Sequence, residues 1–183
     1  MFLKLLAEIV TVVIRNRDKR YRAKLFIRNL ASWLYIKRKA KLAEKGFRCG
    51  KKVKINNNTY IHESASLNGV QVLGSGRFEI GKYTHTGDDI LVITDNHNYN
   101  GEYIPYDTTN IIKDVIIGEA CWLGARVTLL PGTVLGEGCI VQAGSVVHGK
   151  IPDLAIIGGN PAQIIKYRDK EHFYKLKSEN KYL

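Results

Sequence analysis

The chain has 183 residues, of which 45% are hydrophobic, and this composition fits one globular unit and argues against a disordered chain. Its formal net charge of +11 is unevenly placed, because residues 1–52 carry 16 Lys and Arg against three Asp and Glu, whereas residues 53–164 carry six against 11. The acidic middle argues against a nucleic-acid partner, and an acidic partner stays open only for the basic N-terminal segment.

The N-terminal segment is expected to be helical. Residues 2–14 are apolar apart from Lys4 and Glu8, and this run is too short to span a bilayer and lacks the features of a signal peptide. Residues 18–45 contain neither Pro nor Gly, and their apolar residues recur at helical spacing among basic ones. We predict helices over 2–14 and 18–45, with Gly46 ending the second, in an N-terminal arm of residues 1–50.

Two uses of this arm are open. An apolar helix beside basic side chains can lie in a membrane interface and contact anionic head groups, here through residues 1–45. The same helices can instead pack on the rest of the protein or on a neighbouring subunit. We expect a cytoplasmic protein, and the membrane alternative would place it peripherally on the inner face of the membrane.

A six-residue repeat dominates the second half of the chain. Aliphatic residues recur at every sixth position, and a small residue precedes each by two: the pairs are Val115 and Ile117, Cys121 and Leu123, Val127 and Leu129, Thr133 and Leu135, Cys139 and Val141, and Ser145 and Val147. Neither a helix nor an ordinary strand has this period. Three such hexads make one 18-residue rung of a triangular prism, with the aliphatics stacked inside and the small residues near the corners.

The repeat also has a looser first half and an interruption. The same period runs through residues 55–73, slips by one residue at 74–76 and resumes over 80–92. Residues 95–114 then break it with a polar and aromatic stretch that contains a proline, so we predict an extended loop there. The expected fold is mainly β: a parallel β-helix over residues 51–160, N-terminal α-helices, and a short basic C-terminal helix within residues 161–183.

The cysteines and histidines do not indicate a metal site. Cys49, Cys121 and Cys139 form no CxxC pair, and two of them occupy the small-residue positions of the repeat, so we expect free, unreactive thiols. No two histidines have the spacing of a metal-binding pair, and we predict no metal.

Three motifs together resemble one known family. VIIGEACWLG at 115–124, LPGTVLG at 130–136 and GGNPA at 158–162 are similar in order and spacing to the hexapeptide-repeat acetyltransferases, in the branch that acetylates maltose, galactosides and polysaccharides. The resemblance covers about residues 53–170 and not residues 1–50. It implies a left-handed β-helix, a homotrimer with active sites between subunits, acetyl-CoA as co-substrate, and a saccharide acceptor.

The resemblance also implies residue roles. The family's general base corresponds to His97 in the extended loop, where a neutral imidazole would take the proton of the acceptor hydroxyl. Asn68 is the nearest match to the family's asparagine that donates to the oxyanion. We expect Asp95, His85 and Tyr99 to line the acceptor pocket.

The expected coenzyme site combines an apolar trough with basic residues. Small or flat side chains at Trp122, Gly124, Ala125, Ala143 and Gly144 would let the pantetheine arm approach the backbone. The phosphates would contact basic residues near the C-terminus, for which the candidates are Lys150, Lys166 and Arg168.

Our leading hypothesis is O-acetylation of a saccharide hydroxyl on a surface polysaccharide precursor, which the basic arm would allow to be lipid-linked. A xenobiotic O-acetyltransferase acting on an antibiotic hydroxyl is a second interpretation, since the GGNPA segment looks similar there. A third, from a different class, is a non-catalytic trimeric scaffold tethered by its arm.

Overall fold

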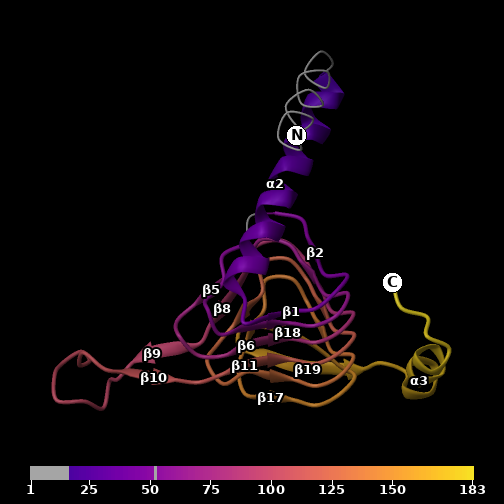
Figure 1. Cartoon of the computed structure of the whole chain (residues 1–183). Helices are drawn as coiled ribbons and strands as arrows, with labels where there is room; N and C mark the ends of the chain where they lie inside the picture. The colour runs from indigo at the N-terminus through magenta and orange to yellow at the C-terminus, as the bar shows by residue number, and fades with distance from the viewer. Residues whose placement is uncertain (1–16, 52) are drawn as a thin grey trace.

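The computed structural model describes residues 17–51 and 53–183, with side chains from Tyr21 onward, so the predicted helix over 2–14 lies outside the described residues. The chain winds into a triangular prism (Figure 1). Helix α2 (Arg17–Lys39) rises from one end of the prism, and a hairpin and helix α3 (Lys170–Ser178) project from opposite sides. No helix in the described part of the chain is long and apolar enough to cross a membrane.

Each side of the prism is a parallel sheet with one strand per rung, and we call the three sides faces A, B and C. Face A contains β1 (Leu42–Ala43), β3 (Thr59–Ile61), β6 (Phe78–Ile80), β11 (Val115–Ile117), β14 (Val134–Leu135) and β17 (Lys150–Ile151). Face B contains β2 (Arg48–Cys49), β4 (Ser66–Leu67), β7 (His85–Thr86), β12 (Trp122–Leu123), β15 (Ile140–Val141) and β18 (Ala155–Gly159), and β19 (Ala162–Tyr167) pairs antiparallel with β18. Face C contains β5 (Val70–Leu73), β8 (Ile90–Ile93), β13 (Thr128–Leu129) and β16 (Val146–Val147), extended by a bridge between Lys54 and Gln71.

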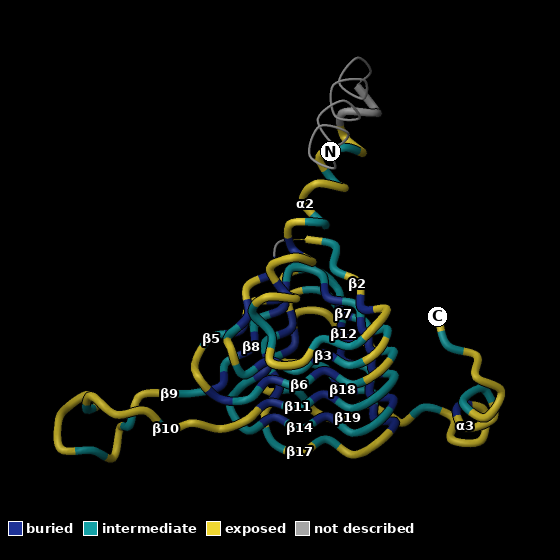
Figure 2. The backbone as a smooth tube through the Cα atoms, in the orientation of Figure 1, coloured by how far each residue is buried: buried dark blue, intermediate teal, exposed yellow. Residues whose placement is uncertain are grey.

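The repeat predicts the interior correctly. The aliphatics at the repeat positions from Ile117 to Val147 are at most 1% exposed, and Figure 2 shows that buried residues recur along the rungs of the prism. The small residues two positions earlier are also buried, since Cys121, Thr133, Cys139 and Ser145 point inward as well. Each hexad therefore places two side chains inside. The corners are formed by the residues between the end of one strand and the start of the next. The prediction of a left-handed parallel β-helix is confirmed.

The N-terminal arm ends earlier than predicted. Helix α2 ends at Lys39 rather than near residue 45, and the β-helix starts at β1, ahead of the expected boundary at residue 51. Gly46, with φ of +74°, lies in a turn of the first rung and does not end a helix. Residues 40–45 lack helix-breaking residues, but their backbone pairs with β3 instead, and Phe47, Val53 and Ile55 fill the first rung.

The interruption leaves the prism as a hairpin. Strands β9 (Asp95–His97) and β10 (Asn110–Ile112) pair antiparallel between the face C strand β8 and the face A strand β11. The stretch predicted as a loop therefore departs from the corner between faces C and A, and it extends away from the body of the prism (Figure 1).

Beyond the last rung the chain turns back on itself. Asp169 caps the N-terminus of α3 by accepting from the His172 backbone N–H, and Phe173 is the buried residue of this helix. Residues 179–183 then return to face B, where the Tyr182 ring stacks on Tyr83 with 3.9 Å between ring centroids. Face B is thus partly covered by the chain's own C-terminal tail, residues 179–183.

Candidate active site

His97 is the last residue of β9 and lies in the exposed hairpin, in register with Asn110. Its ring stacks flat on Tyr106, with centroids 4.0 Å apart and planes 7° from parallel. Neither ring nitrogen has a hydrogen-bond partner in the part of the chain that the structure describes. The stack fixes the ring by its face, so its nitrogens remain available at the edge, as a general base requires.

The hairpin is held by its own polar side chains. The Asn98 amide donates to the Asp107 carboxylate and to the Thr109 hydroxyl, at 3.4 and 3.1 Å. Asp107 in turn accepts from the hydroxyl and the backbone N–H of Thr109, and these two bonds lower its pKa. The network ties the two strands together and keeps His97 in a defined position outside the prism.

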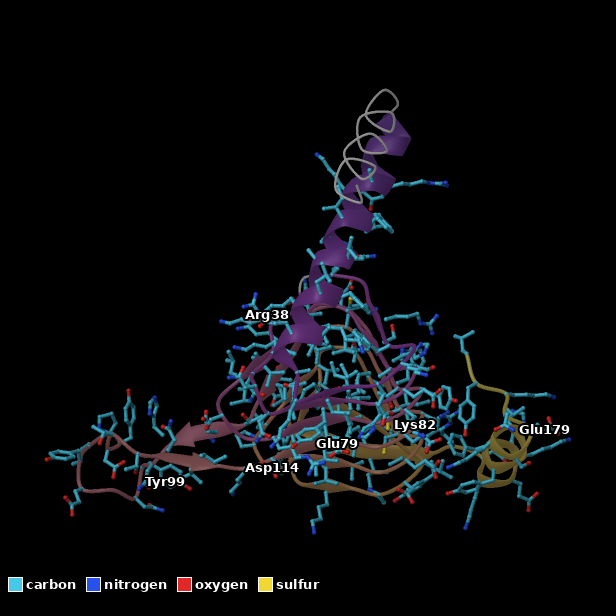
Figure 3. All side chains as sticks on the ribbon, viewed as in Figure 1. Arg38, Glu79, Lys82, Tyr99, Asp114 and Glu179 are labelled. Atoms are coloured by element: carbon cyan, nitrogen blue, oxygen red, sulfur yellow. The ribbon has the colours of Figure 1, made fainter. Side chains whose placement is uncertain are left out.

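Two of the predicted acceptor-binding residues belong to the same segment. The Asp95 carboxylate accepts from the backbone N–H and the hydroxyl of Ser75, at 3.0 and 3.2 Å, and so anchors the slip in the repeat at residues 74–76. Tyr99 lies two residues beyond the end of β9 in the hairpin, with 68% of its surface exposed (Figure 3).

A second region gathers part of the predicted coenzyme site. Ala125, Ala143 and Gly144 lie in successive rungs at the corner between faces B and C, where they line an open groove of about 1190 Å³. A Cβ on Gly144 would meet nothing within 4 Å, so the groove is open above that backbone. The corner offers the narrow, smooth wall that a pantetheine arm needs.

Glycine at this corner also serves the packing of the rungs. A Cβ on Gly124 would lie 2.5 Å from the Ala143 backbone nitrogen. Asn68 belongs to the same corner, where its amide nitrogen donates to the Thr86 carbonyl at 3.0 Å. Its amide donor is therefore used to join two rungs, and Asn68 lies at a different corner from the one that carries the hairpin.

The remaining predicted residues lie elsewhere. Trp122, 57% exposed, follows His85 along the outer side of face B, and both line an apolar pocket of about 360 Å³ beneath the C-terminal tail and α3. Arg168 lines the same pocket and is engaged by the protein, since it donates to the Gly138 carbonyl and lies over the Phe173 ring. Lys150 is exposed on β17 of face A, and Lys166 is exposed on β19.

His85 is the predicted residue with the most constrained environment. The Arg48 guanidinium lies 3.3 Å from its Nε2 and also donates to the Leu183 backbone oxygen. Partial burial, together with the positive charge of Arg48, lowers the His85 pKa and favours a neutral ring. Arg48 thus links His85 on face B to the C-terminal tail.

The structure divides the predicted site between two corners. His97 departs from the corner between faces C and A, whereas Ala125, Ala143 and Gly144 form the wall at the corner between faces B and C. A prism side separates them, so one chain alone does not bring the imidazole to the groove. Within residues 17–51 and 53–183 no cluster of His, Cys, Asp or Glu could hold a metal ion.

Sequence reasoning missed the charged residues of the groove. Its lining includes Arg28 from α2, Lys51 and Lys54 from the first rung, and Asp88 and Arg126 from later rungs. The excess of basic residues before residue 55 was visible in the sequence. The sequence could not reveal that the first rung begins at residue 42. This start places both Lys51 and Lys54 along the groove that the later small residues line.

A prism of stacked hexads with a protruding hairpin and a small-residue corner is the architecture of hexapeptide-repeat proteins. The bacterial transferase hexapeptide (six repeats) family model matches residues 114–149, which contain the strict part of the repeat. Residues 114–149 thus form a hexapeptide repeat, the chain is similar in sequence to bacterial acetyltransferases, and the resemblance noted in the sequence is confirmed.

One curated relative illustrates the similarity in sequence. The chain is 37% identical over 122 residues to "Putative lipopolysaccharide biosynthesis O-acetyl transferase WbbJ" of Escherichia coli (strain K12), covering 62% of this chain and 58% of the relative. It spans about half the length of the curated relatives it matches first.

Among solved structures, a maltose O-acetyltransferase from Clostridium difficile 630 is 19% identical, with a TM-score of 0.66 over 91% of this chain and 86% of that one. A hexapeptide-repeat acetyltransferase from Vibrio cholerae O1 biovar eltor, complexed with acetyl coenzyme A, is 24% identical, with a TM-score of 0.57 over 72% and 69% of the two chains. At these identities the structures establish the shared fold.

Proposed function

We propose that this protein is an acetyl-CoA-dependent O-acetyltransferase that modifies a saccharide hydroxyl, on a precursor of a surface polysaccharide such as capsule or O-antigen. The named relatives support the substrate class, since they include proteins named for lipopolysaccharide and colanic acid biosynthesis. The smooth groove along Ala125, Ala143 and Gly144 supports a long, narrow co-substrate.

The observation that carries this proposal is the separation of His97 from the groove. Each chain offers an imidazole on a protruding arm at one corner and an open groove at another, so a neighbouring copy completes the site. A ring of copies related by rotation satisfies every arm and every groove at once. We therefore propose a homotrimer, in which the exposed Tyr103 and Ile104 of each hairpin contact the next subunit.

The chemistry needs one base and no covalent enzyme intermediate. His97 takes the proton of the acceptor hydroxyl as the oxygen attacks the thioester carbon of acetyl-CoA. The tetrahedral oxyanion then collapses, the carbon–sulfur bond breaks, and the imidazolium returns the proton to the leaving thiolate. The products are the acetyl ester and CoA. Asn68 remains a weaker proposal for the oxyanion donor, because its amide already bonds to Thr86.

The test compares CoA release by wild type and His97→Ala with acetyl-CoA and a panel of sugars and lipid-linked saccharides. Loss of the general base should lower kcat by about 10² to 10⁴-fold and leave CoA binding intact. His172→Ala, an exposed histidine on α3, is the matched control and should keep full turnover. Unchanged turnover in His97→Ala would contradict the assignment. A wild type that does not bind acetyl-CoA would instead support the trimeric scaffold.

We also propose that α2 attaches the enzyme peripherally to the cytoplasmic face of a membrane. The helix packs on the first rung through Ser32 and Ile36, while Phe26, Ile27 and Leu34 on its other sides are exposed. The exposed apolar stripe has basic residues beside it, which is the composition of interfacial helices.

Vesicles of phosphatidylcholine with phosphatidylglycerol test this attachment by co-sedimentation. The double variant Phe26→Glu and Leu34→Glu should pellet much less than wild type, because each carboxylate opposes insertion and repels anionic lipid. Tyr174→Glu on α3 controls for added charge at an exposed aromatic residue. Equal pelleting of all three proteins would remove the membrane proposal and favour α2 as a contact between subunits.

A further inference from the structure

The groove is chemically different at its two ends. Its wall at the later rungs consists of Ala125, Ala143 and Gly144 beside the Arg126–Asp89 pair, whereas the end beside α2 is lined by three cations, Arg28, Lys51 and Lys54. Figure 1 shows α2 standing on this end of the prism. Since these residues come from α2 and the first rung, the basic end is built by the segment that has no match among the family motifs.

Each of the three cations is directed to the surface by the local backbone. Lys54 is exposed between the buried Val53 and Ile55, so strand alternation points it out of face C, and it forms no ion pair with any residue that the structure describes. The Arg28 guanidinium donates to the Gly50 carbonyl at 2.7 Å, which uses one of its five N–H groups. Lys51 pairs with Asp88 at 2.6 Å, and both side chains are about half exposed.

The acidic residues of the groove leave an excess of positive charge. Asp88 offsets Lys51, and Asp89 lies 4.0 Å from Arg126. Arg28 and Lys54 therefore remain as the two uncompensated charges among the groove residues. A guanidinium and an ammonium at one end of a groove form a typical binding site for phosphate oxygens.

The outer side of face C shows the same polarity. The outward residues follow one another in register from Lys54 through Gln71, Leu91 and Thr128 to Val146. This row begins with a charged side chain, continues with a mixture of polar and apolar ones, and ends with the apolar Val146. A molecule lying along this edge would thus place its anionic part by the first rungs and its apolar part by the last.

The position of the hairpin along the prism axis sets the height at which the reaction would occur. It leaves the chain between β8 and β11, after the third rung, and rotation about an axis parallel to the prism keeps that height in the neighbouring copy. The small residues from Ala125 onward lie on one side of this level, and Lys51 and Lys54 lie on the other. The coenzyme would occupy the first side, which leaves the basic side to the acceptor.

We propose that Arg28, Lys51 and Lys54 form a subsite for a phosphate or pyrophosphate carried by the saccharide acceptor. This inference rests on the proposed function, because it divides the same groove between the co-substrate and the acceptor. The acceptor is then a saccharide phosphodiester, either a soluble sugar nucleotide or a lipid-linked saccharide, and not a neutral free sugar.

Calorimetric titration of inorganic pyrophosphate into the full-length protein tests the subsite without requiring turnover. We expect Lys54→Ala to weaken pyrophosphate binding about five- to tenfold, the loss of one exposed charged contact. Lys45→Ala is the matched control, since Lys45 is an exposed lysine of the same rung outside the groove, and it should bind as wild type. Equal affinity in all three proteins, or no binding to wild type, would overturn the subsite.

A competition experiment separates the acceptor from the coenzyme. Pyrophosphate should still bind when CoA saturates the protein, and CoA should bind Lys54→Ala and wild type equally. Displacement of pyrophosphate by CoA, or a tenfold loss of CoA affinity in Lys54→Ala, would overturn the assignment and place the coenzyme phosphates at this end.

Two further probes identify the source of the phosphate, namely UDP-galactose in solution and phosphatidylcholine vesicles containing farnesyl diphosphate. Weaker binding of Lys54→Ala to either probe supports the subsite and names its source, whereas equal binding of the variant to both contradicts it. If pyrophosphate binds as expected but no acetyl transfer occurs with any acceptor, the subsite stands and the proposed function fails.

Discussion

Glycine has two different roles at the corner between faces B and C. Gly124 is required by the neighbouring rung, because a Cβ there would lie 2.5 Å from the Ala143 nitrogen, whereas a Cβ on Gly144 would enter the open groove. We expect Gly124→Ala to lower the free energy of unfolding by about 1–3 kcal/mol through overpacking, measured by urea denaturation.

Gly144→Ala should affect coenzyme binding more than Gly124→Ala does. Its φ of +73° makes a side chain cost about 1–2 kcal/mol, and the methyl group narrows the groove, so CoA binding should weaken more than in Gly124→Ala. Titration of CoA into both variants checks this, and a Gly144→Ala protein with wild-type CoA affinity would show that the coenzyme does not lie along this wall.

His85 gives the protein a pH dependence. Its pKa is lowered in the folded state by burial and by Arg48, so the unfolded chain, with a pKa of about 6.5, binds the proton more readily. The stabilisation is present above pH 6.5 and is lost as the pH falls through the folded pKa.

Denaturation at pH 7.5 and 5.5 measures this effect. Wild type should lose more stability between these values than His85→Gln, which has no proton to gain. An equal loss in the two proteins would mean that His85 has the same pKa in the folded and unfolded chains, or that other groups carry the acid sensitivity.

The break in the repeat predicts a segment that leaves the prism, and the choice of His97 within it comes from the family resemblance. Motif spacing could not show that Trp122 and Arg168 line a different cavity of the chain from Ala125 and Ala143, because it does not say which face of the prism a side chain occupies. Their roles in coenzyme binding stay predictions. Trp122 points out of face B and Ala125 lies at the corner between faces B and C, so residues three positions apart line different cavities.

Among the elements, the hairpin is separable from the prism. Its strands bond to each other, and the predicted loop turned out to be a hairpin because Asn98, Asp107 and Thr109 hold the two strands together. We expect replacement of residues 99–106 by a two-residue Asn-Gly turn to leave the unfolding of the prism nearly unchanged while abolishing trimer formation and acetyl transfer.

Light scattering after size-exclusion chromatography, with thermal unfolding in parallel, checks this expectation. An active trimer without the hairpin tip would contradict its role as the arm that joins the subunits. Loss of cooperative unfolding would show instead that the prism depends on the hairpin.

Among the elements, α2 was predicted least well, because its C-terminal end was placed too late. Residues 40–45 have good helix-forming composition, and helical spacing alone cannot detect a competing strand. Their use as the first rung is decided by partners far along the chain, namely the β3 backbone and the cavity that Phe47 fills. Tertiary pairing overrides local preference here, as it does in many short strands.

At the scale of the whole molecule, the separated half-sites predict complementation. Mixing His97→Ala with Ala143→Trp, a variant whose groove is blocked, should restore activity in mixed trimers. Each half-site is intact in half of the subunits, so about a quarter of the interfaces combine an intact arm with an intact groove.

Refolding the two variants together and measuring CoA release tests this arithmetic. The separately refolded proteins, mixed afterwards, serve as the control and should stay inactive. A co-refolded mixture as inactive as its components would mean that arm and groove act within one chain.

The fold as a whole was the most predictable property, because a six-residue period admits few other structures and each hexad repeats the same inward pattern. The homotrimer stays a proposal. It depends on where the hairpin corner lies relative to the groove corner, and this relative position is defined only once the rungs are stacked.

Stacked rungs also make the groove a molecular ruler. Neighbouring parallel strands are about 4.8 Å apart, so the distance from the hairpin to any later corner residue grows in steps of that size. Insertion or deletion of one 18-residue rung after β11 would move the C-terminal segment by one step without rotating it. The number of rungs beyond the hairpin therefore sets how far the groove extends along the axis, and it leaves the position of His97 unchanged.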